Sequence, residues 1–344
     1  MKQSHKVLSA VALLGTIAMG LCGCGGDTSP NATGAPASTT SGSLSATPGH
    51  AGSGSTSPTS SQAARSAAPQ RPQMLLDTIE PETGTTVGVA MPISVVFSKP
   101  VAASARGDVE KHLQLTTSVP VTGAWHWFGS RRVDFRPEAY WLQGTKVTLD
   151  AKLAGVADGN GRYGAHSYVH SFTVGSDDEV HVYANQHVMK VSRNGAVVKT
   201  FPIDAGRAAY PSWTGTMAVM GKAREVLMDS CSVHIACDKN DPNYYHANYP
   251  LAVQLTVSGT YVHYSDGDPQ PGNSGSHGCI HLSWADARWF YGFVRQGDPV
   301  TITGSPRAAA APDNGYADYD VTNWNAWTSP STSGLGQLTT STTT

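Results

Sequence analysis

The sequence is poor in charge. Only 14% of its 344 residues are Asp, Glu, Lys or Arg, and the formal net charge at pH 7 is −2. Globular proteins average about 25% charged residues, and a nucleic-acid-binding surface needs a cluster of uncompensated Lys and Arg. We therefore expect no nucleic-acid partner.

Long apolar runs are also scarce. The extended run VLSAVALLGTIAMGL, residues 7–21, follows the short basic start MKQSHK. It is too short for a comfortable membrane span and has the layout of a secretory signal peptide. This pattern predicts that residues 1–23 are removed and that the rest of the chain is exported.

The end of the signal region resembles a bacterial lipobox, in which a peptidase cuts before a Cys that then carries lipid. In LCGC, Gly23 is the small residue wanted before the cut, which makes Cys24 a better acceptor than Cys22. Residues 24–72 are almost wholly Ser, Thr, Ala, Gly and Pro, a composition that predicts a flexible linker. We expect a lipid-anchored protein on the extracytoplasmic face of the cell membrane, acting in the cell wall; an ordinary signal peptide with a stray Cys is the alternative.

Cysteine is scarce as well, with five in the chain. Beyond the signal region there are three, Cys231, Cys237 and Cys279, and an odd number outside the cytosol leaves one thiol with no disulfide partner in its own chain. Cys231 and Cys237 are six residues apart and close a small disulfide loop if geometry permits. Cys279 then remains a thiol.

The rest of the chain has mainly β patterning. Residues 73–175 read as about seven short strands between turns, which predicts an immunoglobulin-like sandwich. Three of its histidines, at 126, 166 and 170, are better explained as strand residues than as metal ligands. Residues 176–304 read as a second β-rich domain with a hairpin at Asn194-Gly195 and one helix, capped by Ser283 with Asp286 three residues later.

The last segment changes in composition. Residues 305–328 carry several Tyr and Trp, which solvated tails seldom do, so we expect them to pack on the folded body. Residues 329–344 are polar and predict a disordered tail.

The stretch GSHGCIHLS, residues 275–283, concentrates reactive side chains. Gly278 frees the backbone before Cys279, and the helix that follows directs its positive end toward the sulfur, which lowers a thiol pKa. A nucleophilic Cys needs a base, and His263, at the end of a predicted strand and so on a stiff platform, is preferred to His277 and His281. The His and Cys spacing matches no common zinc pattern, so we expect no metal; zinc and a purely structural loop are the alternatives.

These stretches resemble the L,D-transpeptidase family, whose pattern is a His, a loop and then Ser/Thr-His-Gly-Cys. GTTVGVAMPISVVFSKPV and TGAWHWF are similar to the immunoglobulin-like domain that precedes the YkuD-type catalytic domain in actinobacterial members. The resemblance implies a mainly β fold, no cofactor, and an acyl transfer on peptidoglycan stem tetrapeptides. Cys279 would form a thioester with release of D-Ala, His263 would be general base and acid, His277 would shape the site, and the backbone N–H groups near Gly278 and Cys279 would bind the oxyanion.

The resemblance also implies a substrate-binding set and a carbapenem target, in a protein expected to be a monomer. The set comprises Met228, Ser230, Tyr244, Tyr245, Tyr264, Ser276 and His281. Two of these depart from the family, since His281 stands where Asn is usual and Tyr264 where Ser is common. The alternatives are an L,D-carboxypeptidase on the same scaffold and a non-catalytic cell-wall-binding lipoprotein.

Overall fold

The computed structural model describes residues 72–265, 272–316, 324–330 and 334–342. The predicted signal peptide, Cys24 and the linker up to residue 71 lie outside the described residues. Contacts divide the chain into two units, Met1–Arg65 and Ser66–Thr344, and every described residue belongs to the second. None of the helices described is long and apolar enough to cross a membrane.

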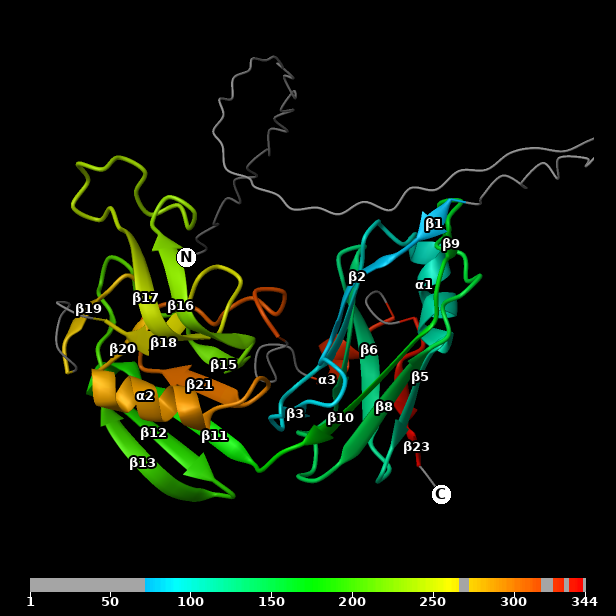
Figure 1. Ribbon diagram of the computed structural model, residues 1–344, viewed down its shortest axis with the longest axis horizontal. Helices are drawn as coiled ribbons and strands as arrows, with labels where there is room; N and C mark the ends of the chain where they lie inside the picture. Colours follow the sequence, from blue (N-terminus) through cyan, green and yellow to red (C-terminus); the bar gives the residue numbers. More distant parts are fainter. Residues whose placement is uncertain (1–71, 266–271, 317–323, 331–333, 343–344) are drawn as a thin grey trace, which may run out of the picture. The chain divides into compact units, whose positions relative to one another are not determined.

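The first described region is a pair of five-stranded sheets (Figure 1). The order in one sheet is β2 (Leu76–Glu80), β4 (Ile93–Phe97), β7 (Arg132–Pro137), β6 (Thr122–Phe128) and β22 (Gln337–Thr339). The order in the other is β23 (Ser341–Thr342), β5 (Leu113–Thr117), β8 (Lys146–Ala151), β10 (Tyr168–Val174) and β3 (Thr86–Val87). Two short strands, β1 (Gln73–Met74) and β9 (Tyr163–Gly164), pair beside them. The immunoglobulin-like sandwich predicted from the sequence is thus confirmed.

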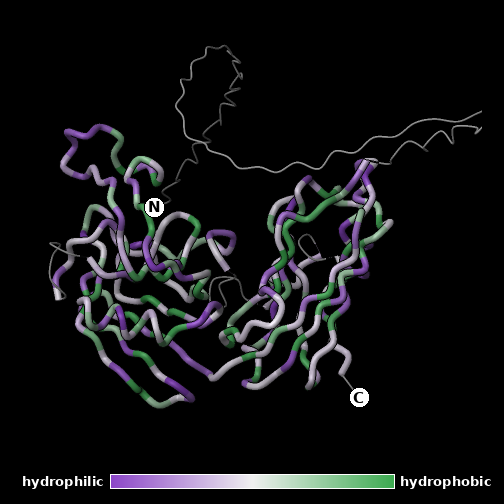
Figure 2. Tube along the Cα trace, viewed as in Figure 1, coloured by the Kyte–Doolittle hydropathy of each residue, from purple (hydrophilic) through white to green (hydrophobic). Residues whose placement is uncertain are grey.

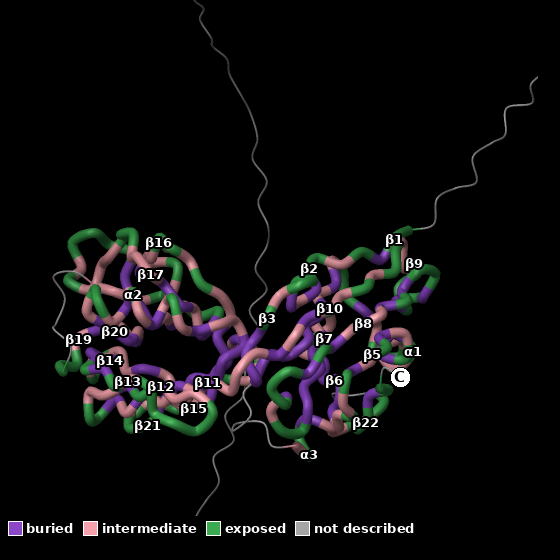
Figure 3. Tube along the Cα trace, turned by 60° about the horizontal axis from the view of Figure 1, so that its bottom comes forward, coloured by how far each residue is buried: buried purple, intermediate pink, exposed green. Residues whose placement is uncertain are grey.

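One apolar cluster fills the space between these sheets. Successive strand residues alternate between hydrophobic and polar along strands such as β8 (Figure 2), and the hydrophobic ones are buried (Figure 3). The buried rings of this cluster include Trp125, Phe135 and Trp141, with Trp125 and Phe135 edge to face at 5.4 Å between ring centroids. Successive side chains of a strand point to opposite faces of the sheet, so an alternating sequence places its hydrophobic residues on the face that meets the core.

A helix in this region was not expected. The helix α1 (Ala103–Lys111) has only a weak apolar face, so helical periodicity gives little signal there. It buries Glu110, whose Oε1 accepts a hydrogen bond from Trp127 Nε1 at 2.8 Å. Tertiary contact, not helix propensity, holds this segment in place.

The C-terminal segment adds strands to the sandwich. Residues 329–344 were expected to be disordered, but residues 334–342 form β22 against β6 and β23 against β5. Ahead of them, α3 (Trp324–Trp327) places Trp327 fully buried and stacked on His126, whose Nδ1 bonds to the Trp327 carbonyl at 3.0 Å. A polar sequence forms strands here because existing sheet edges offer it backbone partners.

The second region contains two further sheets. One has the order β13 (Ala196–Pro202), β12 (Val188–Arg193), β11 (Asp178–Tyr183), β21 (Pro299–Thr303) and β15 (Gly215–Ala218). The other has the order β16 (Gly221–Asp229), β17 (His246–Gln254), β18 (Tyr261–Tyr264) and β20 (Ile280–Leu282). The short strands β14 (Ala205–Gly206) and β19 (Ser274–Ser276) pair in parallel, and η1 (Ala184–Gln186) links β11 to β12.

Two local predictions in this region are confirmed. Asn194 and Gly195 form the turn of the β12–β13 hairpin with φ of 51° and 77°. The helix α2 (Trp284–Phe293) begins after Ser283, whose Oγ accepts a hydrogen bond from the Asp286 N–H at 3.2 Å. The capped end of α2 therefore lies directly after β20, which follows Cys279.

Candidate active site

Cys279 lies between β19 and β20 and is half-buried. Its thiol donates to the carbonyl oxygen of Gly259, at 3.6 Å from Sγ. Cys279 and His281, two residues later on β20, line the same cavity. The neighbouring strand β18 is parallel to β20 and sets His263 directly beside His281.

The loop before Cys279 is closed by a serine. Ser276 Oγ donates to the Cys279 carbonyl at 2.6 Å and accepts from the Gly278 N–H at 3.0 Å. Gly278 has φ of +119°, a conformation that side chains disfavour, so Gly is required there. Ser276, predicted as a substrate contact, is only 2% exposed and uses its hydroxyl to shape this loop. The Gly278 N–H, predicted as an oxyanion donor, already has an acceptor.

His263 is the buried base candidate. It is 2% exposed, and its Nδ1–H donates to the Tyr264 carbonyl at 2.7 Å, which leaves the lone pair on Nε2. Burial, and then the charge of nearby His281, lower the pKa of His263 to about 3. The imidazole is therefore neutral, and able to accept a proton, throughout the neutral range.

His281 is held by a buried carboxylate. Its Nδ1–H donates to Asp204 Oδ2 at 3.1 Å, and Asp204 Oδ1 accepts from the Gly275 N–H at 2.7 Å. The rings of His263 and His281 meet edge to face, with 4.7 Å between centroids. Sequence reasoning missed Asp204, which lies 77 residues before His281.

His277 is bound to an arginine. Arg207 Nη2 donates to His277 Nε2 at 2.6 Å and also to Asn243 Oδ1. Burial and the adjacent Arg207 charge lower the pKa of His277 to about 4. Because Nε2 is occupied as an acceptor, His277 is a poorer candidate for the base than His263.

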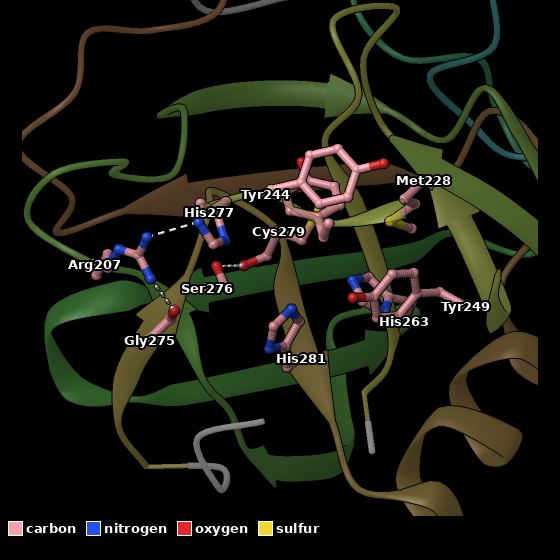
Figure 4. Close-up of a pocket in the computed structure, with 11 residues that line it drawn as sticks. Arg207, Met228, Tyr244, Tyr249, His263, Gly275, Ser276, His277, Cys279 and His281 are labelled. Atoms are coloured by element: carbon pink, nitrogen blue, oxygen red, sulfur yellow. Dashed lines mark hydrogen bonds between the residues drawn. The ribbon is translucent and has the colours of Figure 1, made fainter. Parts of the chain in front are cut away.

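These side chains surround one cavity of about 300 Å³ (Figure 4). Figure 4 shows His263 beside Tyr249, with His281 to their left and Met228 and Tyr244 above them. The predicted residues brought together here include Cys279, His263, His277, His281, Met228, Tyr244 and Tyr245. The cavity is also lined by Arg207, Tyr249, Gly275 and Ser276.

Tyr249 was missed by the sequence analysis. It lies on β17, next to the strand of the base, and its ring meets the His263 ring at 5.0 Å between centroids. The only available signal was an aromatic residue on a strand close in sequence to β18.

The segment between β16 and β17 covers this cavity, and a disulfide joins Cys231 to Cys237 within it. Tyr245, which follows the disulfide loop, lines the cavity, and burial together with the nearby Cys279 raises the pKa of its hydroxyl. Ser230, predicted to bind substrate, lines neither this cavity nor its neighbour. Ser230 is fully buried, and its Oγ bonds to the Ala236 and Tyr245 carbonyls at 2.7 and 3.1 Å.

Tyr264 does not line this cavity either. Its ring packs edge to face on Trp284 at 5.0 Å between centroids, on the side of β18 opposite His263. Neighbouring residues of a strand point to opposite faces, which is why Tyr264 is directed away from the cavity that His263 lines.

A second cavity of about 260 Å³ also reaches Cys279. Its walls share His277 and Tyr245 with the first cavity, and add a second group of residues: Tyr210, Trp213, Val233, His234, Ile235, Ser258, Gly259, Thr260, Gly278 and Arg307. Within the described residues, no group of three or more His, Cys, Asp or Glu is arranged to hold a metal ion. The reactive groups that the site provides are the Cys279 thiol and the neutral His263 imidazole, which line the same cavity.

Comparison with known proteins identifies the class. Residues 35–157 match the model of a bacterial Ig domain, and residues 177–302 match that of the L,D-transpeptidase catalytic domain. The chain belongs to the L,D-transpeptidase family.

Three relatives come from Mycobacterium tuberculosis. L,D-transpeptidase 1 is 32% identical over 249 residues, which are 70% of this chain and 90% of that protein. Probable L,D-transpeptidase 3 is 33% identical, over 69% of this chain and 89% of that protein. L,D-transpeptidase 2 is 32% identical over 72% of this chain, and the match spans 60% of its length.

Solved structures agree with this assignment. An L,D-transpeptidase in complex with imipenem is 30% identical, covers 68% of this chain and 100% of its own, and has a TM-score of 0.57. An L,D-transpeptidase from Mycobacterium smegmatis is 28% identical, covers 67% of this chain and 99% of its own, and has a TM-score of 0.53.

Proposed function

We propose that this protein is an L,D-transpeptidase that forms 3→3 cross-links between peptidoglycan stem peptides. The observation that carries the proposal is a thiol, Cys279, sharing one cavity with a buried neutral imidazole, His263, whose tautomer places the lone pair on Nε2. Membership of the L,D-transpeptidase family supports the same reaction class.

In the acylation step, the proton of the Cys279 thiol passes to His263 Nε2, and Sγ attacks the carbonyl between the third stem residue, a diamino acid, and the terminal D-Ala. The carbon–sulfur bond forms and the carbon–nitrogen bond breaks. His263 returns its proton to the departing amine, so D-Ala leaves as a neutral amine group. The acyl group is then held as a thioester.

In the transfer step, the side-chain amine of another stem's third residue attacks the thioester. His263 takes a proton from this amine, the new amide bond forms, and the carbon–sulfur bond breaks. The proton returns to sulfur and restores Cys279 and neutral His263. No ATP is consumed because the thioester keeps the acyl group activated.

The geometry supports separate roles for the two neighbouring histidines. His277, which accepts from Arg207, fixes the wall next to the nucleophile and is not the base. Oxyanion binding by the Gly278 N–H would require this group to leave Ser276 Oγ. Such donors typically lower the barrier by roughly 3 kcal/mol.

The test is the mass of the products. The purified exported portion, incubated with tetrapeptide muropeptides, should yield cross-linked dimers and free D-Ala, and Cys279→Ala should yield neither. Tripeptides without dimers would show an L,D-carboxypeptidase instead. A wild-type protein that gives no product and no carbapenem adduct on Cys279 would favour a non-catalytic cell-wall-binding protein.

The identity of the base is tested by acylation rates. His263→Gln should slow carbapenem acylation by about 10²-fold or more, whereas His277→Gln should slow it less. Normal acylation by His263→Gln with slow acylation by His277→Gln would reverse the assignment.

The lipid anchor is a further part of the proposal. Cys24 and the linker predict a protein tethered to the extracytoplasmic face of the membrane. Labelling cells with a fatty-acid analogue should tag the wild-type protein, and Cys24→Ala should abolish the tag and release the protein from the membrane fraction. A tag that persists in Cys24→Ala would contradict this assignment.

A further inference from the structure

Arg307 places a positive charge in the second cavity, beside the nucleophile loop. It belongs to the segment after β21, beyond the residues that match the catalytic-domain model. A Cβ built on Gly278 would lie 4.0 Å from Arg307 Nη1. The guanidinium thus lies within a few ångströms of the backbone that carries Cys279.

The Arg307 guanidinium is fixed in place without a counter-charge. It stacks on Trp213, with 3.4 Å between Cζ and the ring centroid, and Nη1 donates to the Pro211 carbonyl at 3.2 Å. Within the described part of the chain, no carboxylate forms an ion pair with it, and burial alone lowers its pKa. A partly buried cation that has no ion-pair partner among the described residues is the arrangement that an anionic ligand completes.

Arg207, which lines the first cavity, differs from Arg307 in the number of hydrogen bonds that its guanidinium donates. Its fork already donates to Asn243 Oδ1, His277 Nε2 and the Gly275 carbonyl. Its donors therefore hold the wall of the site. Arg307 has a single hydrogen bond from its fork to the described residues.

The thiol borders the cavity that Arg307 lines. Gly259, whose carbonyl accepts from Cys279 Sγ, lines the second cavity and not the first. His263, in contrast, lines the first cavity only. A substrate held in the second cavity would meet the sulfur directly, with the base on its other side.

We propose that Arg307 is a carboxylate-binding residue of the second cavity, and that it binds a carboxylate of the donor stem peptide beside Cys279. The planar fork of Arg, pre-oriented by the Trp213 ring, suits the two oxygens of a carboxylate. The identification of the ligand as a stem peptide rests on the proposed function; the carboxylate preference of the site does not. The carboxylate comes either from the terminal D-Ala or from the side chain of the third residue.

The first test measures charge preference at Cys279 without any transpeptidase activity. Iodoacetate and iodoacetamide both alkylate a thiolate with loss of iodide, and they differ by a carboxylate against a carboxamide. We expect the ratio of the Cys279 alkylation rates, iodoacetate over iodoacetamide, to exceed that of an unstructured Cys peptide. Arg307→Gln should lower the ratio about tenfold, and Arg307→Lys should lower it less.

The controls keep this test decisive. Arg288→Gln removes an exposed arginine of α2 that lines neither cavity and should leave the ratio unchanged. A wild-type ratio no higher than that of the free peptide would overturn the proposal, even if Arg307→Gln did not fold. So would an unchanged ratio in folded Arg307→Gln, or a loss confined to Arg207→Gln.

The second test identifies the carboxylate. Three donor tetrapeptides are compared by acyl-enzyme mass: both carboxyl groups free, the terminal carboxyl amidated, and the third-residue side-chain carboxyl amidated. Amidation of the carboxyl group that Arg307 binds should lower wild-type kcat/KM about tenfold, because the ion pair is lost. The same amidation should have no effect in Arg307→Gln. Equal discrimination by wild type and Arg307→Gln would overturn the proposal, whereas no acyl-enzyme from any peptide, with the alkylation preference intact, would overturn the proposed function alone.

Discussion

Asp204 anchors His281 through both its side chain and its backbone. The side chains are joined at 3.1 Å, and the two residues exchange backbone hydrogen bonds of 2.9 and 3.2 Å. His281 is the register partner of His263, and the two rings are in contact. By holding the His281 ring in place, the Asp204 carboxylate therefore fixes the surface against which the His263 ring packs. The residue that departs from the family pattern at position 281 is thus a positioning residue for the base.

Replacing His281 should alter the pH dependence of acylation. The charge of His281 is the second cause, after burial, of the lowered His263 pKa, so His281→Asn should raise the pKa of His263. We expect the acid limb of carbapenem acylation to move to higher pH, by about half a unit to one unit. Stopped-flow acylation from about pH 2.5 to 7, a range that brackets both acid limbs, measures it, with Arg288→Gln as the control. If His281→Asn lowered the acylation rate but left the acid limb at the same pH, His281 would act on His263 only by packing and not through its charge.

The buried His263 should also make stability pH-dependent. Its pKa is about 3 in the folded protein and about 6.5 in the unfolded chain, so between these values the unfolded chain binds the extra proton. This contribution is complete above pH 6.5 and is lost as pH falls, by about 1.4 kcal/mol per unit. Urea unfolding at pH 7, 6 and 5 should show that the stability gap between wild type and His263→Gln narrows toward acid. Parallel curves would mean that His263 titrates normally.

The local features of the site could be predicted from the sequence. The Ser283 cap and the Asn194-Gly195 turn depend on residues a few positions apart, and each is found as predicted. The preference for His263 over His277 also follows from a local argument, the strand end, and the tautomer of His263 is compatible with it. Contacts between residues a few positions apart can be predicted from the sequence, because the backbone geometry of a strand, turn or helix fixes which of these residues meet.

The contacts that complete the site depend on distant pairings. Asp204 reaches His281 across 77 residues, and in the sandwich, away from the site, Thr340 reaches Thr117 across 223. Ser230 and Tyr264 were assigned to substrate because they lie beside motif residues, but strand alternation and the disulfide loop turn them elsewhere. Which face a residue presents is decided by sheet register, which a single sequence specifies only weakly.

Removing the disulfide should loosen the segment that carries Tyr244 and Tyr245. Closing so short a loop contributes roughly 2 kcal/mol in the chain-entropy model. The double variant Cys231→Ser/Cys237→Ser should therefore show a severalfold lower kcat/KM for acylation and faster amide exchange over residues 229–245. Ser232→Ala, an exposed change within the same loop, is the matched control. Unchanged exchange in the double variant would mean that the bonds of Ser230 suffice.

Deleting residues 330–344 should destabilise the sandwich. The deletion removes β22 and β23 and takes from buried Glu110 the N–H donors of Gly334 and Leu335, at 2.9 and 3.0 Å. We expect a loss of roughly 3 kcal/mol, since hydrogen bonds to a charged group contribute about 1.5 to 3 kcal/mol each and the exposed sheet edges lose their partners.

A double-mutant cycle assigns this loss to Glu110. Glu110→Gln should destabilise the full chain clearly but the truncated chain less, because the bonds to Gly334 and Leu335 are already absent there. Urea unfolding of the four proteins measures the coupling, with the exposed Glu82→Gln as the control in the same domain. Equal effects of Glu110→Gln in both chains would show that the C-terminal strands are held by backbone pairing alone, and an unchanged midpoint on truncation would show that they add no stability.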